Sequence, residues 1–134
     1  MPPPKVYADR NAWAIGTPDL VIKMQELTVK GSAPDWWGEI PSVPTGLTED
    51  RYVSAVEIKE VSSAHGGTGG KFIFHHAIHA LVDEKGAVAG TIGSPHEVGR
   101  NAEILEPEAA YKLKAGSQLP LEEWRALGHA LRPA

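Results

Sequence analysis

The sequence predicts a mostly β protein, an antiparallel β-sandwich or jelly roll with a short C-terminal helix. Several short segments alternate apolar and polar residues with the two-residue period of a strand. Clusters of glycine and proline separate these segments, as turns do in all-β folds. The chain has 134 residues, of which 42% are hydrophobic and 22% charged, so it has the size and composition to form one domain with its own core.

We divide the chain into three parts. Residues 1–18 are rich in proline and predict an extended arm. Residues 19–119 hold the predicted strands of the sandwich. Residues 120–134 form a tail that predicts an amphipathic helix, because Pro120 suits a first helical turn and apolar residues follow at helical spacing. These apolar residues are Leu121, Trp124, Leu127 and Leu131.

Three segments of the predicted domain have clear strand patterns. Residues 19–25 and 51–61 alternate apolar and polar side chains, which is typical of strands with one buried face. Residues 71–83 (KFIFHHAIHALVD) are apolar on both faces and lie between Gly70 and Gly86. A strand that is apolar on both faces is expected at the centre of a sheet.

The remaining segments predict turns and short elements. Residues 31–50 and 84–110 contain frequent glycine and proline, so we expect mainly loops there. Residues 111–119 predict a short strand that is broken at Ala115 and Gly116.

Charge and composition exclude several functions. The net charge is -4 and lysine and arginine form no run, so we expect neither a nucleic-acid nor a membrane partner. The absence of cysteine excludes disulfides, thiolate metal sites and a cysteine nucleophile. No apolar run approaches the ~20 residues that span a bilayer, and residues 1–5 (MPPPK) lack the apolar core of a signal peptide, which leaves the localisation open. We find no nucleophile elbow or phosphate-binding loop, and assign no catalytic residue.

The histidines of the segment FHHAIHA carry the most distinctive chemistry. In a regular strand His75 and His79 lie on one face, about 13 Å apart at roughly 3.3 Å per residue, and His76 lies on the other. His75 and His76 can share a metal only if the strand twists or bulges. Imidazole suits copper, zinc, iron or nickel, and two imidazoles need a further ligand. His79, and His96 in the predicted loop GSPHE, are secondary candidates for that ligand.

A second interpretation fits the same spacing equally well. The histidines can be packed strand residues whose rings bond to neighbouring groups, and His79 taken alone is more typical of this case. Residue spacing does not separate the two interpretations.

Four segments in a fixed order resemble a known family. They are residues 13–21 (WAIGTPDLV), 44–53 (PTGLTEDRYV) with 55–58 (AVEI), 74–78 (FHHAI) and 113–119 (LKAGSQL). Over roughly residues 12–119 the pattern resembles the N-terminal domain of copper type II, ascorbate-dependent monooxygenase-like proteins. These are bacterial relatives of peptidylglycine α-hydroxylating monooxygenase.

The resemblance implies an antiparallel jelly roll and two copper centres, one in each of two similar domains, with ascorbate as the reductant. It also implies a periplasmic or extracellular location. His75 and His76 match the pair that provides two ligands of the first, electron-transferring copper. The family takes the third ligand from a His-Tyr motif on a later strand, and the residues after Leu119 contain no such strand histidine. The second domain is not part of this sequence.

From these observations we expect a copper-binding domain that resembles the electron-transfer half of a monooxygenase, an oxidoreductase, and that is inactive alone. Its expected partner is a second monooxygenase domain, or a second copy of the chain joined through a sheet edge that the missing strand leaves exposed. Two alternatives stay open. One is a non-catalytic interaction or assembly module with packed histidines, and the other is a small copper carrier.

Overall fold

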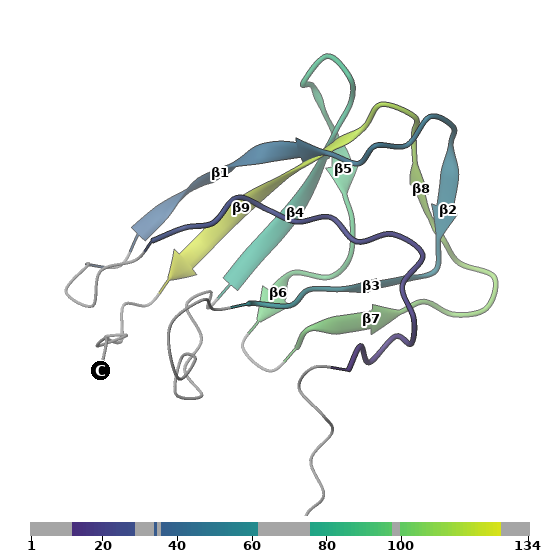
Figure 1. The fold of residues 1–134 in the computed structure, drawn as a ribbon, viewed down its shortest axis with the longest axis horizontal. Helices are drawn as coiled ribbons and strands as arrows, with labels where there is room; N and C mark the ends of the chain where they lie inside the picture. The colour runs from purple at the N-terminus through teal and green to yellow at the C-terminus, as the bar shows by residue number, and fades with distance from the viewer. Residues whose placement is uncertain (1–11, 29–33, 35, 62–75, 98–99, 127–134) are drawn as a thin grey trace, which may run out of the picture.

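The computed structural model describes residues 12–28, 34, 36–61, 76–97 and 100–126 (Figure 1). Every regular element within these ranges is a β-strand, and all strand pairs are antiparallel. The mostly β, antiparallel prediction is therefore confirmed. In this part of the chain no helix has the length and apolar character needed to cross a membrane.

The main sheet has five strands with β4 at its centre. Its order is β1 (Trp36–Pro44), β9 (Gln118–Ala126), β4 (His76–Val82) and β5 (Val88–Thr91), and β6 (His96–Glu97) also pairs with β4. β9 occupies one edge of β4, and β6 and β5 follow each other along the opposite edge. The central position predicted for the strand in residues 71–83 is confirmed over the residues of β4.

Two shorter antiparallel pairs complete the described fold. They are β2 (Arg51–Val53) with β8 (Tyr111–Leu113), and β3 (Ala55–Glu57) with β7 (Ala102–Ile104). The strand predicted over residues 51–61 is thus divided at Ser54, whose carbonyl accepts a hydrogen bond from the Leu105 amide at 2.8 Å. The break lets the two halves pair with different partners.

The predictions of loops over residues 31–50 and 84–110 were too broad. The first range contains β1, and the second contains β5, β6 and β7. β1 tolerates Pro41 and Pro44 because it lies at the edge of the described sheet and has a register shift between Ile40 and Val43. Proline lacks a backbone donor and is accepted at such edges and bulges.

Residues 120–126, for which a helix was predicted, belong to strand β9. β9 has a hydrogen-bonded neighbour on each side, so sheet pairing satisfies its backbone and overrides the helical spacing of its apolar residues. Pro120 lies opposite the register shift of β1, an irregularity of the kind at which proline is accepted in a strand. The rest of the predicted tail, residues 127–134, lies outside the described residues.

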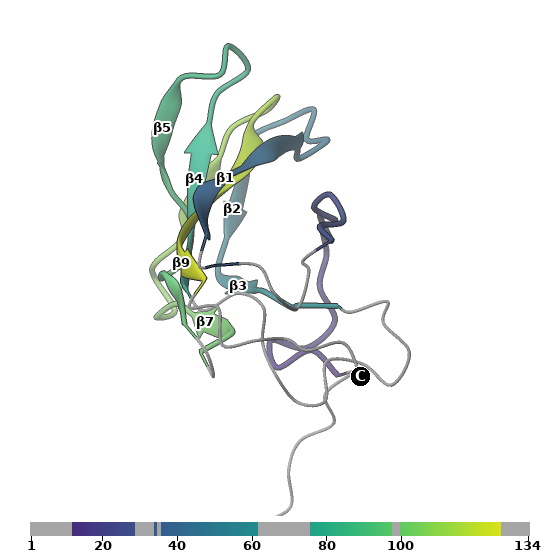
Figure 2. The same ribbon diagram turned by 90° about the vertical axis from the view of Figure 1, so that its left-hand side faces the viewer.

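The segment of residues 12–28 runs across one side of the main sheet (Figures 1 and 2). The strand predicted at residues 19–25 was wrong, because this segment joins no sheet among the described residues. The alternation of apolar and polar residues in this segment reflects packing against the sheet instead. Met24 packs against Ile40 and Ala77, the buried cluster of the main sheet, and the neighbouring Lys23 is exposed.

The part of the predicted arm that the structure describes also makes contacts. The Ile15 amide donates to the Glu57 carboxylate at 3.1 Å, and the Lys59 ammonium lies 4.6 Å from the centre of the Trp13 ring. Residues 12–18 are therefore attached next to β3, and residues 1–11 lie outside the described ranges.

Candidate functional site

β4 places its two described histidines on opposite faces of the main sheet. His76 is the first residue of β4, is half-buried, and has Glu97 of β6 as its cross-strand partner. His79 is buried and shares the face of Ala77, because residues two apart in a strand point the same way. His75 lies outside the described residues, so its predicted pairing with His76 stays a prediction.

His96 joins His79 on the buried face. The Cα partner of His96 is Ala77, and residues opposite each other in an antiparallel pair share a face. His96 is therefore the diagonal neighbour of His79, at a backbone separation of roughly 7–8 Å that two long side chains can bridge. The prediction that His96 lies in a loop was wrong, since it is a strand residue that is only 3% exposed.

A bulge between β5 and β6 produces this placement. The Ile92 amide donates to the His79 carbonyl at 2.9 Å, so Ile92 lies opposite His79. The chain then takes four steps to reach His96, while β4 takes two steps from His79 to Ala77. The two extra residues make room for a bend at Gly93, where φ is +75°. Because their number is even, His96 returns to the face of Ile92.

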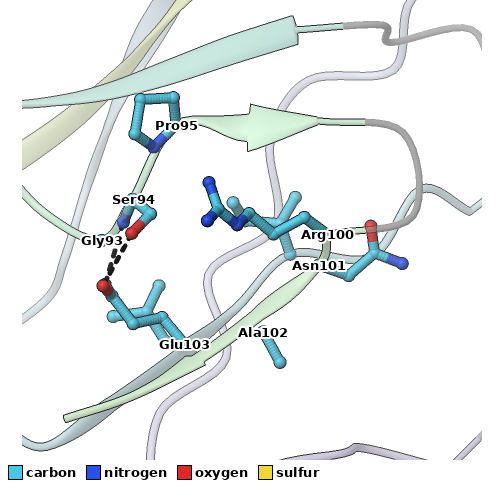
Figure 3. A pocket seen from close by; sticks show the side chains of 9 residues that line it. Gly93, Ser94, Pro95, Arg100, Asn101, Ala102 and Glu103 are labelled. Carbon is cyan, nitrogen blue, oxygen red and sulfur yellow. Dashed lines mark hydrogen bonds between the residues drawn. The ribbon is translucent and has the colours of Figure 1, made fainter.

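Glu103 of β7 anchors the bulge. Its carboxylate accepts hydrogen bonds from the Ser94 amide at 2.9 Å and the Ser94 hydroxyl at 2.7 Å (Figure 3). It also accepts a hydrogen bond from the Tyr111 hydroxyl at 2.9 Å. The bonds from Ser94 and then Tyr111 hold the pKa of Glu103 below its ordinary value, and Glu103 in turn raises the pKa of Tyr111. Charge-assisted bonds of this kind are stronger than neutral ones, so Glu103 fixes the segment that leads into His96.

Sequence reasoning did not single out Glu103. Its only signal is a carboxylate within a short alternating segment, and such residues are usually solvated. The hollow next to it in Figure 3, between the bulge and β3, has room for about one water molecule and offers no space for an organic ligand.

His79 is held in its neutral form. His79 is only 8% exposed, and its Nε2 has no hydrogen-bond partner among the residues that the structure describes. Burial, and secondly the charge of the neighbouring His96, lower the pKa of His79 from 6.5 to about 4. At neutral pH the ring therefore carries no proton on one nitrogen, which is the state that binds metals.

The described residues bring together two metal donors of the predicted set, His79 and His96, and leave His76 apart on the other face. No group of three histidine, cysteine, aspartate or glutamate side chains suitable for a metal occurs within the described ranges. Comparisons with protein-family models, with curated proteins and with solved structures found no match for this chain. The chemistry must therefore be judged from the two imidazoles themselves, and a pair of imidazole ligands suits a metal of low coordination number.

Proposed function

We propose that this chain is a copper-binding β domain that resembles the electron-transfer half of a copper-dependent monooxygenase and does not turn over alone. One observation carries the proposal. All three histidines that the structure describes lie on two paired strands, His76 and His79 on β4 and His96 on β6. The chain thus concentrates imidazole in one part of the fold.

The donor set is compatible with copper and argues against calcium and magnesium. Imidazole nitrogen binds copper well, whereas calcium and magnesium require oxygen ligands, and the chain has no thiolate. The family resemblance assigns the electron-transfer copper to His75 and His76, with a jelly-roll arrangement of the strands around it. The antiparallel pairs of the described residues are compatible with that arrangement.

Copper titration tests the proposal. We expect the purified chain to bind Cu(I) and Cu(II), and the double variant His75→Ala/His76→Ala to lose one equivalent of copper. Unchanged stoichiometry and affinity in this variant would contradict the assignment of copper to this pair. Oxygen consumption with ascorbate then separates the roles, because a domain with one electron-transfer centre should show no turnover above free copper.

The outer edge of β5, one of the two edges of the described main sheet, favours an additional interaction role. All four residues of β5 are exposed, Val88 by 71%, and no described strand pairs with the outer edge of β5. We propose that a second domain or a second copy pairs there, as exposed edges favour. Sedimentation of wild type and of Val88→Lys tests this, and a monomeric wild type at high concentration would exclude the homodimer.

A further inference from the structure

We infer that His79 and His96 form a second, two-coordinate site for Cu(I), on the buried face of β4, in addition to the copper proposed at His75 and His76. This site does not depend on that proposal. It follows from the register of β4, β5 and β6 and from the surroundings of the two rings.

The register gives the rings a common meeting point. Ala77 is two residues from His79 on β4 and is the cross-strand partner of His96. Ala77 carries only a methyl group, which leaves space for the neighbouring rings, and it is only 1% exposed. Two nitrogens that bind one metal linearly lie roughly 4 Å apart, twice a metal–nitrogen bond of about 2 Å. Side chains on diagonal neighbours in a sheet can reach this separation.

A bound ligand would explain why His79 is buried although its Nε2 has no hydrogen-bond partner among the described residues. A buried polar nitrogen normally has a hydrogen-bond partner, and leaving it without one costs about 1–3 kcal/mol. Nε2 of His79 has none among the described residues. The ring lies opposite Ile92 and close to the apolar cluster of Ile40 and Ala77, which supplies no donor or acceptor of its own.

The number of available ligands and the apolar environment favour Cu(I) over zinc and Cu(II). Zinc takes four ligands, and Cu(II) prefers three or four in a tetragonal arrangement, but the described residues provide two. Cu(I) accepts two imidazoles in a line. Its single charge also costs less to bury in an apolar environment than a double charge does. Since His79 is already neutral at pH 7, a metal ion does not have to displace a proton from it.

Copper stoichiometry separates this site from the first. We expect wild type to bind two equivalents of Cu(I), measured anaerobically by competition with a coloured chelator. The variant His79→Gln/His96→Gln should bind one, and the matched control His76→Gln should keep the equivalent held by His79 and His96. Two equivalents in the His79→Gln/His96→Gln variant would overturn the inference.

A comparison of the two double variants shows which proposal fails. If His75→Ala/His76→Ala and His79→Gln/His96→Gln each abolish all copper binding, there is one shared site, so the inference of a second site is wrong and the copper function stands. If only His79→Gln/His96→Gln changes the stoichiometry, the assignment to His75 and His76 is wrong and the second site stands.

A measurement on wild type avoids variants that fail to fold. Silver(I) is a redox-stable probe with the same preference for linear coordination as Cu(I). We expect two equivalents of silver(I), enough to fill both proposed sites, to shift the NMR signals of the His79 and His96 rings, whereas zinc at the same concentration should leave these two ring signals unchanged. Silver that leaves both ring signals unchanged, or zinc that shifts them equally, would contradict a two-coordinate Cu(I) site.

Discussion

Acidification should destabilise the metal-free protein through His79. Its pKa is lowered from 6.5 to about 4 in the folded state. As the pH falls below 6.5, the unfolded chain takes up a proton at this imidazole and the folded chain does not, so the free energy of unfolding decreases. The decrease is about 2 kcal/mol between pH 7 and pH 5, and about 3 kcal/mol in total once the pH is below 4.

Urea unfolding followed by tryptophan fluorescence, with a metal chelator present, measures this effect at pH 7 and pH 5. The variant His79→Gln keeps a polar side chain but does not titrate, so its loss of stability between the two pH values should be smaller by about 2 kcal/mol. His76→Gln removes an imidazole from the opposite face of the same strand, and should keep the full loss of wild type. Equal pH dependence in wild type and His79→Gln would refute the burial argument.

Two further predictions concern the bulge that positions His96 and the core cluster of the main sheet. Glu103→Gln should lower the free energy of unfolding at pH 7 by about 1–2 kcal/mol, because a partly exposed carboxylate loses its charge-assisted bonds from Ser94 and Tyr111. In wild type the stability that the Glu103 carboxylate contributes is present above the ordinary pKa of a glutamate and is lost as the pH falls through the lower pKa of the folded state. Urea unfolding should therefore show a smaller loss of stability at acid pH in the variant than in wild type. Ile40→Ala should cost about 2–5 kcal/mol, since Ile40 is 1% exposed in the core cluster, and a cost below 1 kcal/mol in thermal or urea unfolding would contradict that placement.

The fold was predictable where local pattern and tertiary environment agree. The strand in residues 71–83 is apolar on both faces, and its described part, β4, has strands on both edges. Tertiary pairing overrode the local pattern elsewhere. The apolar residues after Pro120 have helical spacing, but this segment forms strand β9 because it pairs with β1 on one side and β4 on the other. The alternation in residues 19–25 reflects packing of Met24 on the sheet rather than strand pairing.

The candidate site was predictable in its residue type but not in its pairing. A histidine-rich strand is visible in the sequence, and the alternation of a strand already separates the faces of His76 and His79. The role of His96 is not visible, because it depends on a long-range register. The segment GSPHE has the composition of a turn, and only the pairing of His96 with Ala77 shows that the chain re-enters the sheet there.

The count of residues in the bulge at Gly93, Ser94 and Pro95 therefore decides whether the pair exists. A bulge with two extra residues returns His96 to the buried face, whereas one extra residue would turn its ring to the face of His76. Glu103 accepts hydrogen bonds from the amide and the hydroxyl of Ser94. It thereby stabilises the bulge with two extra residues against a one-residue shift in strand register. Deletion of one residue from this bulge should abolish Cu(I) binding by His79 even if both imidazoles remain in the chain. The metal site that we infer is thus a property of strand register, which explains why residue spacing along the sequence did not reveal it.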